Sequence, residues 1–104
     1  MADYIEKPGE GVGLKDKDEV KIPRRWKVLL LNDDYTSMEF VVMVLVNIFR
    51  KTPEQAEAIM LSVHRRGMGV AGVYVKDIAE AKIKATHALA REEGFPLRCD
   101  MQPE

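Results

Sequence analysis

Two groups of side chains have the types and the spacing that binding chemistry needs. Asn32, Asp33 and Asp34 directly follow an apolar run, and His64 comes four residues after Met60, on the same face of an expected helix. Two carboxylates and an amide oxygen suit a cation, and an ammonium group offers three donors that need acceptors. Both groups also have a purely structural interpretation. Asn and Asp stabilise turns, and a histidine in a last helical turn interacts favourably with the helix dipole.

Other kinds of site chemistry are not supported by the sequence. The two serines, Ser37 and Ser62, lie outside any Gly-x-Ser-x-Gly motif, and Cys99 lies between two charged residues. His64 and His87 are 23 residues apart and lack the spacing of metal ligands. We therefore expect no catalytic residues, no metal site and no cofactor.

Composition limits the class of protein. The chain has 104 residues and a formal net charge of −1, which suits one domain and argues against general nucleic-acid binding. RNA binding through Arg24, Arg25, Arg65 and Arg66 is a weak alternative, because surface aromatics between them are scarce. The longest apolar run, 40–46, is too short to span a membrane, and residues 1–8 lack the apolar segment of a secretory signal. With a single cysteine, these features predict a cytoplasmic protein.

Local signals predict three helices. Thr36-Ser37-Met38-Glu39 is typical of a capping box with Thr36 at the N-cap. Thr52-Pro53-Glu54-Gln55 is a second start signal, and the apolar positions after it repeat with helical period until Gly67. Gly94 is a C-terminal stop signal for the third helix. The expected helices are 40–49, 53–66 and 76–93.

Apolar runs at 26–31 and 69–74, and a short run within 95–101, predict three strands. The order β-α-α-β-α-β predicts an α+β sandwich, in which a small three-stranded antiparallel sheet packs against three helices. Residues 1–24 include eleven charged side chains and no periodic apolar face. We therefore expect a flexible N-terminal extension over 1–24 and a folded domain over 25–104.

The segment KVLLLNDDYTSMEFV, residues 27–41, resembles the strand–turn–helix signature of the ClpS family, the adaptors of the ATP-dependent Clp protease. The later segments 60–64, 71–74, 79–82 and 96–99 match this family in order, so the resemblance runs from about Trp26 to Met101. It implies a fold similar to the C-terminal domain of the ribosomal stalk protein. It also implies a non-enzymatic adaptor that binds the N-terminal Leu, Phe, Tyr or Trp of substrate proteins (an N-degron) and delivers them to a Clp ATPase–protease.

The resemblance also implies roles for single residues. Asn32, Asp34 and His64 should hold the α-amino group of the substrate, with Asp33 supporting the rim. Met38 should exclude β-branched first residues. The side-chain pocket should be lined by Thr36, Met38, Val41, Met60, Val63 and Leu97.

Partner contacts follow from the same resemblance. Asp77, Glu80 and Lys82 fall where the family contacts the N-terminal domain of its ATPase, and residues 1–24 correspond to the extension that the unfoldase engages. An alternative remains, namely a small regulatory interaction domain with no specificity for N-termini. In that case Met43 and Val46 of the apolar first helix would face the partner.

Overall fold

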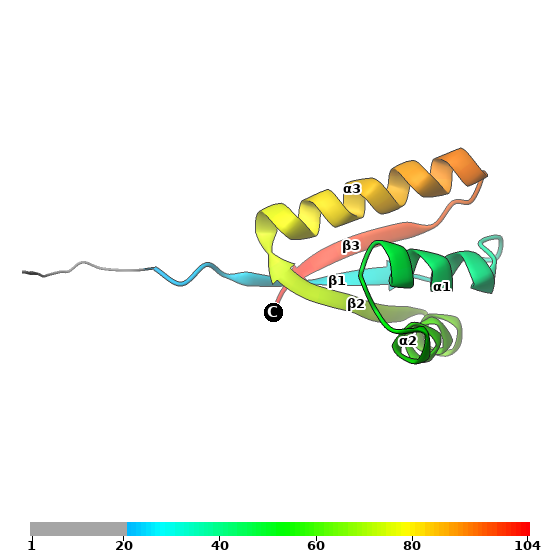
Figure 1. Cartoon of the computed structure of the whole chain (residues 1–104), viewed down its shortest axis with the longest axis horizontal. Coiled ribbons are helices and arrows are strands. Elements are labelled where there is room, and N and C mark those ends of the chain that lie inside the picture. The colour runs from blue at the N-terminus through cyan, green and yellow to red at the C-terminus, as the bar shows by residue number, and fades with distance from the viewer. Residues whose placement is uncertain (1–20) are drawn as a thin grey trace, which may run out of the picture.

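A computed structural model describes residues 21–104 of the chain (Figure 1). The predicted extension falls mostly on residues 1–20, which lie outside the described part, and residues 21–24 have no regular secondary structure. The element order is the predicted one. The elements are β1 (Arg25–Leu31), α1 (Met38–Asn47), α2 (Pro53–Arg66), β2 (Met68–Val75), α3 (Lys76–Glu93) and β3 (Arg98–Pro103).

The sheet has the order β2-β1-β3, and both pairs of neighbours are antiparallel. The most apolar strand, β1, therefore lies in the centre. Its side chains alternate between the two faces. Val28 and Leu30 are fully buried in the core that the helices cover, whereas Leu29 belongs to the other face of the sheet. This arrangement confirms the predicted α+β sandwich.

The prediction that Thr36 caps the first helix is wrong. Ser37 is the N-cap residue, and its hydroxyl oxygen accepts a hydrogen bond from the Phe40 amide at 3.1 Å. Thr36 lies one residue before the cap, and its amide and hydroxyl both donate to the carboxylate of Asp33. Helix α1 therefore starts at Met38, before the predicted start, and ends at Asn47.

The signals for the other two helices are confirmed. Thr52 and Gln55 form a complete capping box at the start of α2. The C-cap residues of α2 and α3 are Gly67 and Gly94, which have φ angles of 90° and 81°. Only glycine adopts this left-handed conformation readily. The N-cap residue of α3 is Val75, which supplies no side-chain hydrogen bond.

Helix α3 is joined to α1 by a contact that the sequence did not predict. Helix α1 has no basic residue in its last turn. The ammonium group of Lys82 on α3 donates a 2.7 Å hydrogen bond to the carbonyl oxygen of Ile48, at the C-cap of α1. It also lies 5.2 Å from the ring centre of Tyr74 and 6.0 Å from that of Phe49. Lys82 thus supplies the positive charge that favours the C-terminus of a helix.

Candidate functional site

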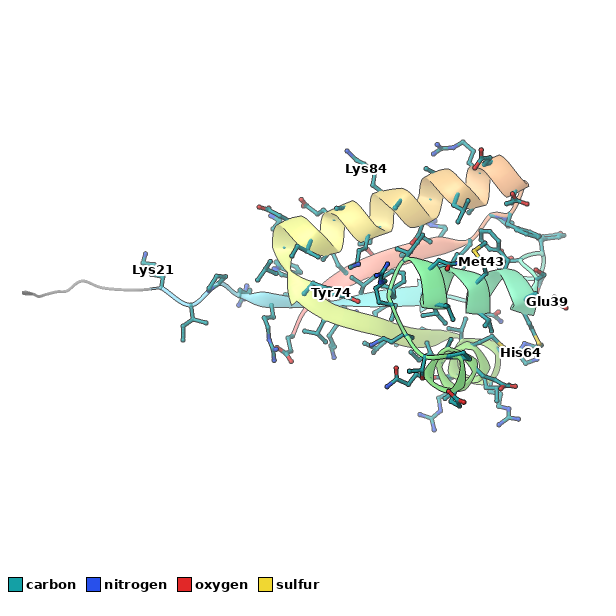
Figure 2. The ribbon with its side chains drawn as sticks, in the orientation of Figure 1. Lys21, Glu39, Met43, His64, Tyr74 and Lys84 are labelled. Carbon is teal, nitrogen blue, oxygen red and sulfur yellow. The ribbon has the colours of Figure 1, made fainter. Side chains whose placement is uncertain are left out.

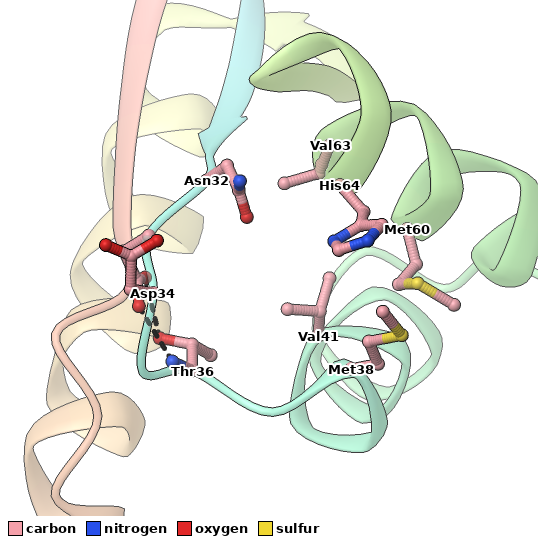
Figure 3. Close-up of a pocket in the computed structure, with 9 residues that line it drawn as sticks. Asn32, Asp34, Thr36, Met38, Val41, Met60, Val63 and His64 are labelled. Atoms are coloured by element: carbon pink, nitrogen blue, oxygen red, sulfur yellow. Dashed lines mark hydrogen bonds between the residues drawn. The ribbon is translucent and has the colours of Figure 1, made fainter.

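A cavity of about 230 Å³ lies between the loop that follows β1 and the facing sides of α1 and α2 (Figure 3). The predicted polar and apolar site residues meet around it, although 28 positions separate Asn32 from Met60 in the sequence. Its lining consists of Asn32, Asp33, Asp34, Thr36, Met38, Val41, Met60, Val63 and His64. All nine were named from the sequence.

The polar side of the cavity is fixed by a backbone contact between β1 and α2. The amide of Asn32 donates to the carbonyl oxygen of Gly67 at 2.9 Å, just beyond the end of each element. Gly69 of the neighbouring strand β2 lets that strand approach α2, since a Cβ there would lie 2.9 Å from a methyl carbon of Val63. The Asn32 and His64 side chains consequently face each other across the cavity (Figure 3).

Asp33 organises the loop. Its carboxylate accepts hydrogen bonds from the amide of Tyr35 at 2.8 Å and from the amide and the hydroxyl of Thr36, both at 2.7 Å. Burial raises the pKa of Asp33, but the bond from the Thr36 hydroxyl and the two amide bonds outweigh it, so that the pKa lies below the usual carboxyl value. Asp33 is therefore negatively charged at neutral pH, and its lone pairs are largely committed to the loop.

The remaining polar groups are available to a ligand. Within residues 21–104, no side-chain hydrogen bond engages Asn32, Asp34 or His64. Asp34 is exposed and stands at the outer rim of the loop, while His64 is exposed in the last turn of α2 (Figure 3). An amide oxygen, an imidazole nitrogen and a rim carboxylate thus surround one opening, which suits a small cationic donor such as an ammonium group.

The other side of the cavity is apolar. Val41, Met60 and Val63 are buried, whereas Met38 is 44% exposed and stands at the mouth. Leu97, the tenth residue predicted here, is not among the lining residues. It belongs to the buried core and is 3% exposed.

The three residues predicted to contact an ATPase differ in exposure. Asp77 and Glu80 are exposed in the first turns of α3, and Asp77 lines a groove of about 470 Å³ together with Trp26 and Val75. Lys82 is only partly exposed, and its ammonium group is bound to the Ile48 carbonyl. The positive charge of Lys82 therefore already interacts with the C-terminus of α1 inside the fold.

Neither a metal site nor a membrane span is found in the part of the chain that the structure describes. No three His, Cys, Asp or Glu side chains among residues 21–104 come together in an arrangement that could hold a metal ion. Over the same residues, none of the helices combines the length and the apolar character that crossing a membrane requires.

Comparison with known proteins gives one consistent result. Residues 21–100 match the family model described as the ATP-dependent Clp protease adaptor protein ClpS. The chain is 63% identical over 86 residues to an ATP-dependent Clp protease adapter protein ClpS from Oleidesulfovibrio alaskensis, covering 83% of each chain. It is 56% identical over 89 residues to the protein of the same name from Deinococcus radiodurans, covering 86% of this chain and 79% of the relative.

A solved structure agrees with these relatives. Agrobacterium tumefaciens ClpS2 bound to L-phenylalaninamide matches with a TM-score of 0.76 and 44% sequence identity. The match covers 80% of this chain and 100% of the other.

Proposed function

Since this chain belongs to the ClpS family of Clp protease adaptors, we propose that its cavity holds the first residue of a substrate protein, Leu, Phe, Tyr or Trp. The chain is an adaptor and not an enzyme, as the names of its relatives state. The observation that carries the proposal is the cavity itself, in which unused polar groups and an apolar wall share one opening. L-Phenylalaninamide, the ligand of the related ClpS2, combines a free α-amino group with an aromatic side chain.

We assign the α-amino group to the polar side of the cavity. Asn32 and His64 face the opening and would accept its hydrogen bonds, and Asp34 would add negative charge from the rim. Asp33 would act indirectly by holding the loop. A residue inside a chain has no ammonium group, so it would leave these acceptors unpaired at a cost of about 1–3 kcal/mol each. The cavity would therefore select the N-terminal residue of a chain over internal residues.

The apolar side of the cavity would receive the first side chain. Burial of a Leu or Phe side chain between Val41, Met60 and Val63 would contribute about 1.5–3 kcal/mol. Met38 at the mouth would crowd a side chain that branches at Cβ. The burial of the side chain and the hydrogen bonds to the ammonium group favour binding, and the cost of association opposes it. The balance suits a dissociation constant in the micromolar range, so the substrate can be released.

We further propose that Asp77 and Glu80 contact the N-terminal domain of a Clp ATPase. Both residues are exposed and belong to the first turns of α3, and Figure 1 shows the start of α3 at the opposite end of the sheet from the loop that follows β1. One surface could then hold a substrate while the other holds the ATPase. We assign no direct contact to Lys82.

The single free cysteine, Cys99, is consistent with a reducing compartment, and we propose that the protein acts in the cytoplasm.

The decisive experiment is a titration of a fluorescent peptide that begins with Phe, alongside its N-acetylated twin. The free peptide should bind with at least roughly tenfold higher affinity, since acetylation removes the charge-assisted hydrogen bonds. Asn32→Ala should lose this preference, and Glu92→Gln, an exposed change on α3, should keep it. Equal binding of the two peptides would favour the alternative of an interaction domain without specificity for N-termini.

The ATPase contact has a separate test. The double variant Asp77→Ala, Glu80→Ala should lose binding to an isolated N-terminal domain of a Clp ATPase while keeping the Phe-ended peptide.

We also propose that residues 1–24 form an extension used during hand-off. Removal of residues 1–20 should then preserve peptide binding and slow the degradation of a Phe-ended substrate by the ATPase–protease.

A further inference from the structure

Helix α1 is apolar on nearly every side. Of its ten residues, only Glu39 and Asn47 have polar side chains. One side of the helix packs into the core, and the outer side presents Val42, Met43 and Val46, which are half-buried. A surface helix normally carries polar residues on its outer side, and a helix that is apolar all round is normally buried. The outer side of α1 therefore has the composition of a contact surface.

Two grooves flank this helix, which Figure 1 shows between α3 and α2. On the α2 side, a groove of about 440 Å³ has an apolar floor that includes Val42 and Met43. On the α3 side, a groove of about 660 Å³ is lined by four apolar residues, Ile48, Ala85, Ala88 and Leu89. The apolar surface therefore extends from α2 across α1 to α3.

The two grooves differ in charge. Glu39 and Glu57 are exposed on the α2 side, where no basic residue within 21–104 lines the groove. Arg91 is exposed on the α3 side, where Glu92 accompanies it. A surface with acidic groups on one flank and a cationic group on the other can pair with a second copy of itself.

Glu39 and Arg91 lie towards the same end of α1. The Phe40 ring at the start of α1 is 4.9 Å from the Phe95 ring, just beyond the end of α3, so the two helices run antiparallel. The hydrogen bond from Lys82, in the first half of α3, to the C-cap of α1 agrees with this direction. A two-fold axis parallel to α1 would place the α2 side of each copy against the α3 side of the other. Glu39 would then meet Arg91 of the second copy, and this contact would occur twice.

We propose that a second copy of this chain covers the outer side of α1, in a two-fold symmetric dimer that pairs Glu39 of each copy with Arg91 of the other. Burial of Met43 and Val46 supplies the attraction. The net charge of −1 leaves little overall repulsion between the copies. Because only one helix and its flanking grooves take part, the interface is small and the dimer should be weak.

Sedimentation velocity of the full chain between about 1 µM and about 1 mM tests this proposal. We expect a dimer with a dissociation constant of roughly 10–100 µM. Met43→Asp should abolish it, because the variant buries two unpaired charges at the centre of the interface. Ile78→Asp is a matched control at an α3 residue that is 48% exposed and lines neither groove, and it should leave the dimer unchanged. Circular dichroism shows whether both variants fold.

Charge reversal tests the pairing without altering the apolar side. Arg91→Glu and Glu39→Arg should each weaken the dimer by roughly tenfold, since an exposed ion pair contributes up to about fivefold and the contact occurs twice. The double variant Arg91→Glu, Glu39→Arg should regain most of the affinity. A double variant that stays as weak as the single variants would overturn the pairing.

The other outcomes are equally clear. A full chain that stays monomeric throughout the range would overturn the proposal. If only removal of residues 1–20 allowed dimers, the chain's own first residues would be the occupant of this surface, which would overturn it as well. A dimer that survives Met43→Asp would place the interface elsewhere, with the same consequence. These measurements contain no substrate, so their results do not depend on the proposed binding of N-terminal residues.

Discussion

The backbone amide of Asn32 and the carbonyl oxygen of Gly67 are 2.9 Å apart and join the end of β1 to the end of α2. This one hydrogen bond sets the position of the polar loop relative to the helix that carries His64, Met60 and Val63. The candidate site therefore depends on a local feature, the left-handed C-cap at Gly67, as much as on its side chains.

His64→Leu should weaken peptide binding. An imidazole nitrogen of His64 would accept a hydrogen bond from the ammonium group, whereas a leucine side chain offers no acceptor. We expect the affinity for a Phe-ended peptide to fall by roughly tenfold. Fluorescence anisotropy on wild type and on the variant measures this change.

Equal affinity of the two proteins would contradict that role. The neighbouring charges Asp33, Asp34, Arg65 and Arg66 are present in both proteins, so the difference in affinity isolates the imidazole. Circular dichroism shows whether the variant keeps its fold. The second histidine has another role, because His87 accepts a 3.0 Å hydrogen bond from the Cys99 amide of β3 through Nε2.

Thr36→Val should raise the pKa of Asp33. The variant removes the hydroxyl that, with two backbone amides, holds the pKa of Asp33 below its ordinary value in spite of burial. Because the folded pKa is lowered, the stability that this carboxylate contributes is present above its unfolded pKa and is lost as pH falls through the folded value. At pH 7 the free energy of unfolding of the variant should be about 1 kcal/mol lower than that of wild type.

An NMR titration of the Asp33 carboxyl carbon checks this prediction. Thr52→Val is a matched control, since it removes the N-cap hydroxyl of α2 and destabilises by a similar amount. It should leave the Asp33 pKa where it is. An unchanged pKa in Thr36→Val would show that the two amides alone hold the carboxylate.

Lys82→Met should destabilise the fold, whereas Lys84→Met should not. Lys82 donates to the Ile48 carbonyl and lies over two aromatic rings, so its loss should lower the free energy of unfolding by about 1–2 kcal/mol. Lys84 is exposed and points away from the sheet (Figure 2), and its replacement should change stability by less than about 0.5 kcal/mol. Urea denaturation compares them, and equal effects would contradict a structural role for Lys82.

Cys99 should be unreactive in the folded protein. Burial raises the pKa of Cys99 to about 11. A hydrogen bond with Thr86 lowers this pKa by less than burial raises it, and the negative charge of Asp100 raises it further. A thiol reagent at pH 8 should react slowly with native protein and rapidly in urea. Fast labelling of the native protein would show that the thiol is accessible.

The same shift predicts a loss of stability in alkali. Because the folded pKa of Cys99 exceeds the unfolded value of about 8.5, its stabilising contribution is complete below that value and declines as pH rises through about 11. Urea midpoints at pH 7, 9 and 10.5 should fall more steeply for wild type than for Cys99→Ala.

Much of this molecule could be predicted from its sequence because its signals are local. The Thr52–Gln55 box, the stops at Gly67 and Gly94, and the apolar strand each depend on neighbours in the chain. Thr36 and Ser37 show the limit. Both can cap a helix, and the choice depends on the Asp33 carboxylate, which holds Thr36.

Long-range contacts were harder to predict. The bond from Lys82 to Ile48 links residues 34 positions apart, and a lysine on an amphipathic helix carries no signal for such a partner. The place of Leu97 was also hard to predict. Its apolar character fits both a cavity wall and the core. Val41, Met60 and Val63 belong to the core and also line the cavity, whereas Leu97 belongs to the core without lining the cavity.

The central strand β1 separates the cavity from the start of α3, and its seven residues span about 23 Å. Such a strand, hydrogen-bonded on both edges, acts as a rigid spacer with one stable register. If the cavity and the start of α3 each hold a partner as proposed, this spacer keeps the two partners apart, so that neither blocks the other. The two ends should therefore load independently and in either order.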